Sequence, residues 1–102
     1  MKVVFPLFAW LQIIFLSSTA FAQQEWKPLW PEGAPGATGT TEHDIPATLA
    51  FPAPANKANG CTVLVCPGGG YGGLAMDHEG QQIASWMNER GIHAYILRYR
   101  LG

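Results

Sequence analysis

The feature that most constrains this chain is an apolar strand that runs directly into a glycine-rich loop. Residues 61–66 form a nearly continuous apolar run, which is typical of a strand covered on both faces of a parallel sheet. The loop over residues 67–73 contains five glycines. A helix over residues 78–90, with Asp77 as its N-cap, and a second strand over residues 92–97 are expected to follow. This order predicts one βαβ unit with parallel strands and a right-handed crossover.

The segment ahead of this unit is irregular. Residues 23–58 are rich in Pro, Gly and Thr, and one strand is expected over residues 47–51. Gly91 is a natural C′ residue for the helix. The predicted fold class is therefore α/β, with the βαβ unit set in a mostly parallel sheet after a Pro/Gly-rich amino-terminal segment. Parallel sheets carry helices on both faces, so we expect residues 23–102 to be an incomplete part of a larger domain.

The first residues have the pattern of a signal peptide. Lys2 precedes an apolar run over residues 3–16, and Ala20-Phe21-Ala22 is an A-x-A cleavage site. The run is shorter than the roughly 20 residues of a spanning helix. We expect residues 1–22 to be removed and the mature protein to be secreted or periplasmic, without stable membrane insertion. An uncleaved membrane anchor is the alternative.

Charge and cysteine spacing exclude several function classes. The net charge is −1 and no basic patch is present, so nucleic acid is not expected as a partner. Cys61 and Cys66 flank the apolar run, which spans roughly 16 Å as a strand. A disulfide needs Cα atoms about 4.4–6.8 Å apart, so we expect two free, buried thiols. No His or Cys stands at zinc-ligand spacing, and no metal or cofactor is expected.

The glycine loop has three common uses, and two of them fit poorly. Gly68, Gly70 and Gly73 match the G-x-G-x-x-G spacing of dinucleotide-binding proteins. However, residues 74–76 separate the loop from the helix, and residues 98–100 after the second strand lack the acidic side chain that binds ribose. A phosphate-binding P-loop would need Lys followed by Ser or Thr, and neither is present.

The third use is an oxyanion hole. Enzymes that transfer acyl groups stabilise a negative carbonyl oxygen with backbone N–H groups, and consecutive glycines let two such groups point at one atom. In α/β-hydrolases such a loop, of the H-G-G-G type, follows the third strand. Here Pro67 stands in place of the His and Gly68-Gly69-Gly70-Tyr71 follows. A merely flexible glycine loop is the alternative.

Taken together, these segments make the chain resemble secreted bacterial α/β-hydrolases of the hormone-sensitive-lipase-like group and the acetyl-xylan-esterase-like carbohydrate esterases. The resemblance covers residues 26–102. The segments that carry it are Trp30-Pro31, Ala34-Pro35-Gly36, Cys66-Pro67-Gly68-Gly69-Gly70-Tyr71, Asp77-His78-Glu79-Gly80 and Leu97-Arg98-Tyr99-Arg100-Leu101-Gly102.

The resemblance implies a partial α/β-hydrolase fold and a serine esterase that cleaves esters of acetyl or other short acyl groups, with carbohydrate as the expected carrier of the ester. It makes the backbone N–H groups of Gly69 and Gly70 the oxyanion donors. It also suggests Tyr71 and His78 as substrate contacts, although packing over the loop explains Tyr71 equally well and helix-start polarity explains His78. The expected partner is a small-molecule or polysaccharide ester.

The catalytic triad of such enzymes is not found in this chain. No G-x-S-x-G nucleophile motif occurs, and the single serine after residue 22, Ser85, falls inside the predicted helix. The three histidines, His43, His78 and His93, come too early for the usual order of the triad. The nucleophile, acid and His are therefore expected beyond Gly102. A small exported binding or structural protein without catalysis is the competing hypothesis.

Overall fold

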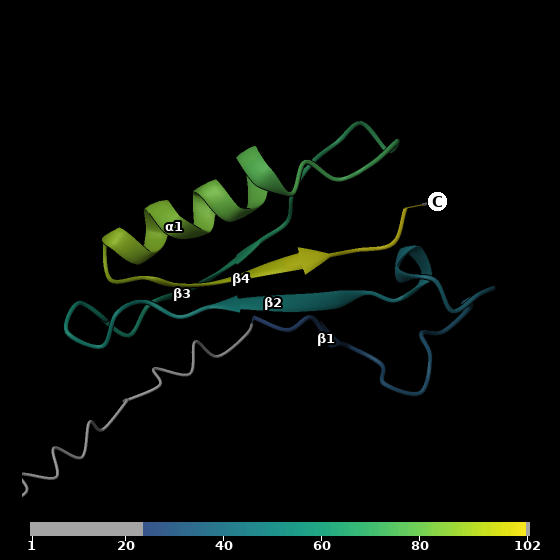
Figure 1. Ribbon diagram of the computed structural model, residues 1–102, viewed down its shortest axis with the longest axis horizontal. Coiled ribbons are helices and arrows are strands. Elements are labelled where there is room, and N and C mark those ends of the chain that lie inside the picture. Colours follow the sequence, from purple (N-terminus) through teal and green to yellow (C-terminus); the bar gives the residue numbers. More distant parts are fainter. Residues whose placement is uncertain (1–23, 102) are drawn as a thin grey trace, which may run out of the picture.

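The computed structural model describes residues 24–101, so the predicted signal peptide lies outside the described residues. The described part is a four-stranded sheet with one helix on it (Figure 1). In chain order the elements are β1 Lys27–Pro28, the 3₁₀ turn η1 Glu42–Asp44, β2 Ala47–Phe51, β3 Thr62–Val65, the π-helical turn η2 Asp77–Gln81, α1 Gln82–Glu89 and β4 His93–Arg98.

The sheet is mixed, with strand order β1-β2-β4-β3. β3 and β4 are parallel, with Val65 opposite Ile96, which confirms the predicted βαβ unit. β2 is antiparallel to β4, and β1 is antiparallel to β2, so the prediction of a mostly parallel sheet is wrong for this part of the chain. The reason lies in residues 52–61. A crossover between parallel strands takes a dozen or more residues and usually includes a helix. The connection from β2 to β3 is shorter and contains no helix, and it reverses the direction of the chain.

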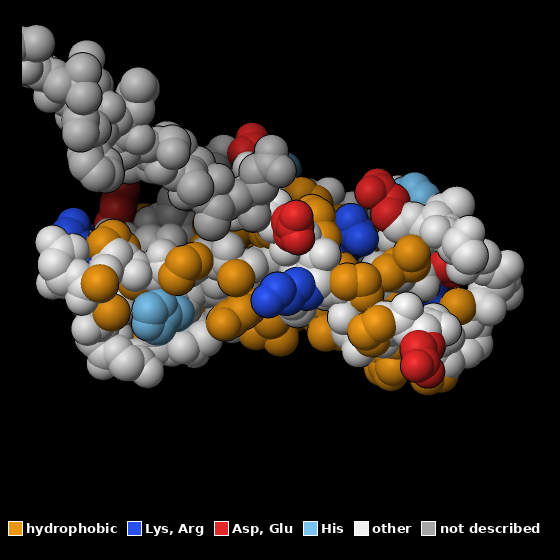
Figure 2. Space-filling model, turned by 60° about the horizontal axis from the view of Figure 1, so that its bottom comes forward, with side chains coloured by type: hydrophobic (Ala, Val, Ile, Leu, Met, Phe, Trp, Pro, Cys, Tyr) orange, Lys and Arg blue, Asp and Glu red, His pale blue; other side chains and the backbone are white. Residues whose placement is uncertain are grey.

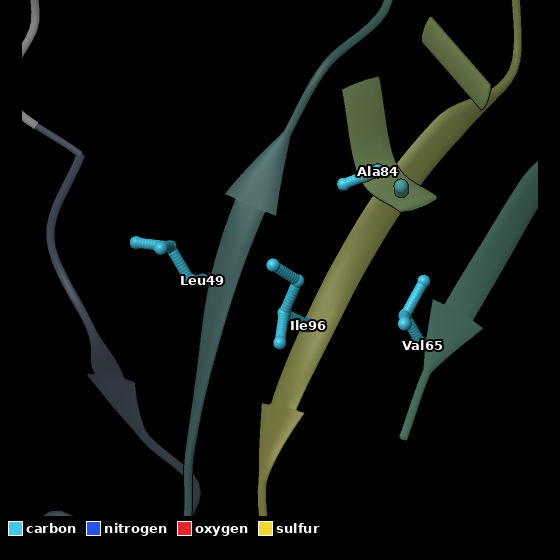
Figure 3. Packing of buried hydrophobic residues seen from close by; sticks show 5 residues of the cluster. Leu49, Val65, Ala84 and Ile96 are labelled. Carbon is cyan, nitrogen blue, oxygen red and sulfur yellow. The ribbon is translucent and has the colours of Figure 1, made fainter. Parts of the chain in front are cut away.

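A small apolar core lies between α1 and the sheet. Ile96 at the middle of β4 is fully buried, and Leu49 and Val65 contact it from the strands on either side. Ala84 of α1 is also fully buried above Ile96 (Figure 3). The alternate residues of three strands therefore face one helix, and the small side chain of Ala84 lets that helix approach closely.

The helix begins differently from the prediction. Residues 77–81 form a π-helical turn, α1 starts at Gln82, and no side chain caps either start, so Asp77 is not an N-cap. Gly80 is buried in this turn, where an added Cβ would lie 3.5 Å from Pro67 and 3.6 Å from Ile96. The π-helical turn therefore lies directly against Pro67 and β4, with room at Gly80 for ordinary van der Waals contact.

The helix ends as predicted. Gly91 has φ +77°, which few residues other than glycine adopt. The N–H of Ile92 donates to the carbonyl of Met87 at 3.0 Å, as in a Schellman motif. Asn88 joins this end of α1 to the sheet, since its amide donates to the carbonyls of Phe51 and Ile92, both at 2.9 Å.

Both cysteines lie just outside β3. They are free thiols, as predicted, but they are exposed and not buried. For Cys66 the reason is that β3 has only one covered face in the described residues: Val65 points to the core, whereas Leu64 is 58% exposed. Cys61 precedes the strand and lies beyond the part that the helix covers. Cys66, like Leu64, is solvent-accessible.

The side of the sheet away from α1 is open. Leu64 and Tyr95, on the neighbouring strands β3 and β4, are 58% and 43% exposed there. Figure 2 shows hydrophobic side chains spread along the side of the molecule that lies away from α1. Within residues 24–101, no helix has the length and apolar character needed to cross a membrane.

Candidate active site

The base of the glycine loop is held by three hydrogen bonds. The N–H of Gly68 donates to Oε2 of Glu79 at 2.7 Å, and the carbonyl of Gly68 accepts the N–H of Ala75 at 2.8 Å. The hydroxyl of Tyr99, just after β4, donates to the carbonyl of Pro67, which is fully buried. The end of β3, the π-helical turn and the end of β4 therefore fix the point from which the loop leaves the sheet.

The tip of the loop is a tight turn. Gly70 and Tyr71 have φ angles of +62° and +63°, and the N–H of Gly72 donates to the carbonyl of Gly69 at 3.3 Å. Two consecutive positive φ angles closed by such a bond are the signature of a type I′ turn. Glycine adopts this conformation freely, but Tyr71 pays roughly 1–2 kcal/mol for it. Strain of this kind concentrates at functional sites.

The loop also requires a glycine at its first bend. A Cβ on Gly69 would lie 2.0 Å from the carbonyl oxygen of Gly73, so the two limbs of the loop are in backbone contact. No hydrogen bond within residues 24–101 is donated by the N–H of Gly69 or Gly70. The loop thus combines an anchored base with two backbone donors that bind no acceptor within the described residues.

The two predicted substrate contacts lie at the edge of this site. Tyr71 is 90% exposed at the tip of the turn, so its side chain does not pack over the loop. His78 is exposed in the π-helical turn. Neither residue lines the cavity described next.

A cavity of about 260 Å³ lies beside the return limb of the loop. It is enclosed by the loop, by η1 and by the end of β4, three segments that meet at one end of the molecule (Figure 1). The residues that line it are Glu42, His43, Gly72, Gly73, Leu74, Met76, Arg98, Tyr99 and Leu101.

Several residues of this cavity lie outside the motifs found in the sequence. Glu42 and His43 stand in the irregular segment, 56 and 55 positions before Arg98, and carry no motif. Glu79 was named as part of the Asp77-His78-Glu79-Gly80 segment, whereas its carboxylate accepts the N–H of Gly68. Only the resemblance over residues 97–102 pointed to the end of β4.

The remaining titratable and nucleophilic groups do not form a triad in the described residues. Ser85 is exposed on α1. Nδ1 of His93 accepts the N–H of Ala53 at 3.0 Å, which makes this histidine a structural link between β4 and the segment after β2. No group of three or more His, Cys, Asp or Glu side chains is placed to hold a metal ion among residues 24–101.

Comparison with known proteins points to one kind of enzyme. No family model matches the chain. Over 43 residues it is 42% identical to an acetylxylan esterase of Xylanibacter ruminicola, and these residues make up 42% of this chain and 9% of that protein. The chain is similar to carbohydrate esterases. Its structure also matches the crystal structure of an acetyl ester-xyloside bifunctional hydrolase from Caldicellulosiruptor lactoaceticus, with a TM-score of 0.56 and 29% identity over 76% of this chain and 28% of that one. The chain thus spans a small part of each relative.

Glu79 gives a direct test of how the loop is held. In Glu79→Ala the N–H of Gly68 loses its acceptor, which lies 2.7 Å away. A net hydrogen bond contributes about 0.5–1.5 kcal/mol, so amide hydrogen exchange at Gly68 should become roughly 2- to 10-fold faster. Exchange read by NMR checks this. Glu79→Gln, which keeps a side-chain oxygen, should show a smaller change.

Glu89→Ala is the matched control, because this exposed glutamate of α1 pairs with Arg90, at 3.9 Å, and not with the loop. Equal exchange rates at Gly68 in Glu79→Ala and Glu89→Ala would show that Glu79 does not hold the loop.

Proposed function

We propose that this chain supplies the oxyanion-hole part of a serine esterase of the α/β-hydrolase type, which removes acetyl or other short acyl groups from carbohydrate. The observation that carries the proposal is the loop after β3. It is anchored on both sides of Gly68, and the N–H groups of Gly69 and Gly70 bind no acceptor within residues 24–101. The similarity to an acetylxylan esterase and to an acetyl ester-xyloside hydrolase supports the substrate class.

The mechanism assigns one role to this chain. When a serine attacks the ester carbonyl, negative charge develops on the carbonyl oxygen, and the two N–H groups stabilise it by hydrogen bonds. These donors are fixed before the reaction, because the base of the loop is bonded to Glu79, Ala75 and Tyr99. The serine, its histidine base and the acid belong, in this proposal, to residues outside the sequence.

The proposal also covers the organisation and location of the protein. Residues 1–22 act as a signal peptide, and residues 23–102 form the amino-terminal part of the hydrolase domain in a secreted or periplasmic protein. Tyr71 and His78 contact the substrate from the rim of the site, since both side chains are exposed next to the loop.

The DNA that follows codon 102 provides the first test. We expect it to encode, in the same or a shifted frame, a G-x-S-x-G motif and a later histidine. The polypeptide that includes this segment should hydrolyse 4-nitrophenyl acetate and acetylated xylan, and a fluorophosphonate should label the serine of that motif. An immediate stop followed by unrelated sequence would favour the exported binding protein, and labelling of Ser85 would overturn the assignment of the nucleophile.

A further inference from the structure

We propose that Tyr99 and Glu79 are positioning residues of the esterase, which hold the two polar ends of the Pro67–Gly68 peptide unit and thereby direct the N–H groups of Gly69 and Gly70. This inference rests on the proposed function and adds two residues that act on the reaction through the loop. It depends on which peptide units of the loop are bonded, on which side of each unit the bond lies, and on the space at residue 68.

The Pro67–Gly68 peptide unit is bonded at both of its polar ends by side chains. The hydroxyl of Tyr99 donates to its carbonyl oxygen, and Oε2 of Glu79 accepts its N–H at 2.7 Å. Proline contributes no N–H to a strand ladder, and the last pair of the ladder between β3 and β4 is Val65 with Ile96. The two side chains therefore fix this peptide unit at the point where the sheet no longer does.

The next two peptide units are bonded on their carbonyl sides, and these bonds set the direction of the proposed donors. The carbonyl of Gly68 accepts the N–H of Ala75 at 2.8 Å, and the carbonyl of Gly69 accepts the N–H of Gly72 at 3.3 Å. In a planar trans peptide the N–H points opposite to the carbonyl. The N–H of Gly69 therefore points away from Ala75, and the N–H of Gly70 points away from Gly72. Both directions depend on the orientation of the peptide unit from which the loop starts.

Glu79 reaches this peptide unit because residue 68 is a glycine. A Cβ on Gly68 would lie 2.8 Å from Oε2 of Glu79 and 3.8 Å from its Cδ, and no other atom beyond the chain neighbours of Gly68 lies within 4 Å. The φ of Gly68 is not positive, so its backbone is compatible with alanine. Gly68→Ala is therefore a substitution that displaces the carboxylate of Glu79 and touches little else.

The first test is steady-state hydrolysis of 4-nitrophenyl acetate by the polypeptide that includes the nucleophile. Loss of an oxyanion donor costs about 10²–10³-fold in kcat, and a misplaced donor should cost less. We expect Glu79→Ala and Tyr99→Phe each to lower kcat by about 10- to 100-fold with little change in KM. Glu79→Gln, which keeps an acceptor oxygen, should recover most of the loss. Tyr95→Phe, which removes a hydroxyl from the open side of β4, should keep wild-type kcat.

Gly68→Ala tests the role of Glu79 from the other side of the hydrogen bond. Alone, it should lower kcat by a factor similar to that of Glu79→Ala. In the Glu79→Ala background it should have no further effect, because the atoms that the new Cβ would meet are then absent. Losses that multiply in the double variant would show that the two substitutions act at separate places, and this would overturn the positioning role of Glu79.

A second measurement, ¹⁵N relaxation of the full chain, separates this inference from the proposed function. The amides of Gly69 and Gly70 should be more mobile on the nanosecond timescale in Glu79→Ala and Tyr99→Phe than in the wild type or Tyr95→Phe. Unchanged relaxation at both amides, or wild-type kcat in both variants when circular dichroism shows them folded, refutes the positioning role. Absence of hydrolysis by the longer wild-type polypeptide refutes the proposed function, and the relaxation of the two amides then still decides whether Tyr99 and Glu79 hold the loop.

Discussion

Gly69→Ala is expected to lower kcat of the active esterase by about 10²–10³-fold, which corresponds to losing one oxyanion donor, or roughly 2.7–4 kcal/mol. The new Cβ would lie 2.0 Å from the carbonyl oxygen and 2.7 Å from the carbonyl carbon of Gly73. Both are backbone atoms, so the two limbs of the loop must separate and the N–H of residue 69 must turn. The measurement is steady-state hydrolysis of 4-nitrophenyl acetate by the polypeptide that includes the nucleophile. KM should change little, because the donor acts mainly in the transition state.

Gly70→Ala is the matched comparison within the same loop. An added Cβ at Gly70 meets nothing within 4 Å, but its φ of +62° is unfavourable for alanine by about 1–2 kcal/mol. We expect a smaller loss of kcat than in Gly69→Ala. Ser85→Ala should retain full activity. Wild-type kcat in a folded Gly69→Ala protein, or loss of activity in Ser85→Ala, would refute the assignment of the oxyanion donors.

Gly91→Ala is expected to lower the free energy of unfolding by about 3 kcal/mol or more, one of the larger effects of a single substitution. Residue 91 would carry a side chain at φ +77°, which alone costs about 1–2 kcal/mol. Its Cβ would also lie 2.0 Å from the carbonyl oxygen of Lys57, so the segment that connects β2 to β3 would have to move. That movement disturbs the bond between the carbonyl of Gly91 and the N–H of Asn59, which are 2.9 Å apart.

Thermal unfolding followed by circular dichroism measures this effect. For a domain of 60–100 residues, each kcal/mol lowers Tm by roughly 4–8 °C. Gly60→Ala is the control, because Gly60 has φ +85° but nothing within 4 Å of an added Cβ. It should show only the conformational cost of about 1–2 kcal/mol. Equal losses in the two variants would mean that contact with Lys57 does not matter.

Local sequence patterns were sufficient to predict the order of the strands, loop and helix around the site. The apolar run, the loop, the helix and the second strand were predicted at or near residues 62–65, 67–73, 82–89 and 93–98, where the structure has them. Gly91 was predicted as the C′ residue and has the positive φ that this role requires. These features depend on side-chain periodicity and backbone freedom within a few residues, so they can be read without knowing the rest of the fold.

The same local patterns gave wrong predictions where contacts with a distant segment determine the local structure or the burial of a side chain. The start of the helix is a π-helical turn that lies against Pro67 and Ile96 at Gly80, and neither neighbour is visible from the helix sequence. The cysteines were expected to be buried because the run between them is apolar, but Cys66 shares the uncovered face of β3 with Leu64, and Cys61 lies before the strand begins.

The sequence by itself determined where the glycine-rich loop lies, between a strand and a helix, and this limited the proposed oxyanion donors to a few backbone N–H groups. Only the tertiary structure decided how those groups are held and what lies beside them. Glu79 reaches the loop from the next turn, and Arg98 meets Glu42 across 56 positions of sequence. The physical reason is that hydrogen bonds and cavities depend on distance in space. The antiparallel pairing of β2 with β4, which carries η1 to the end of β4, sets those distances.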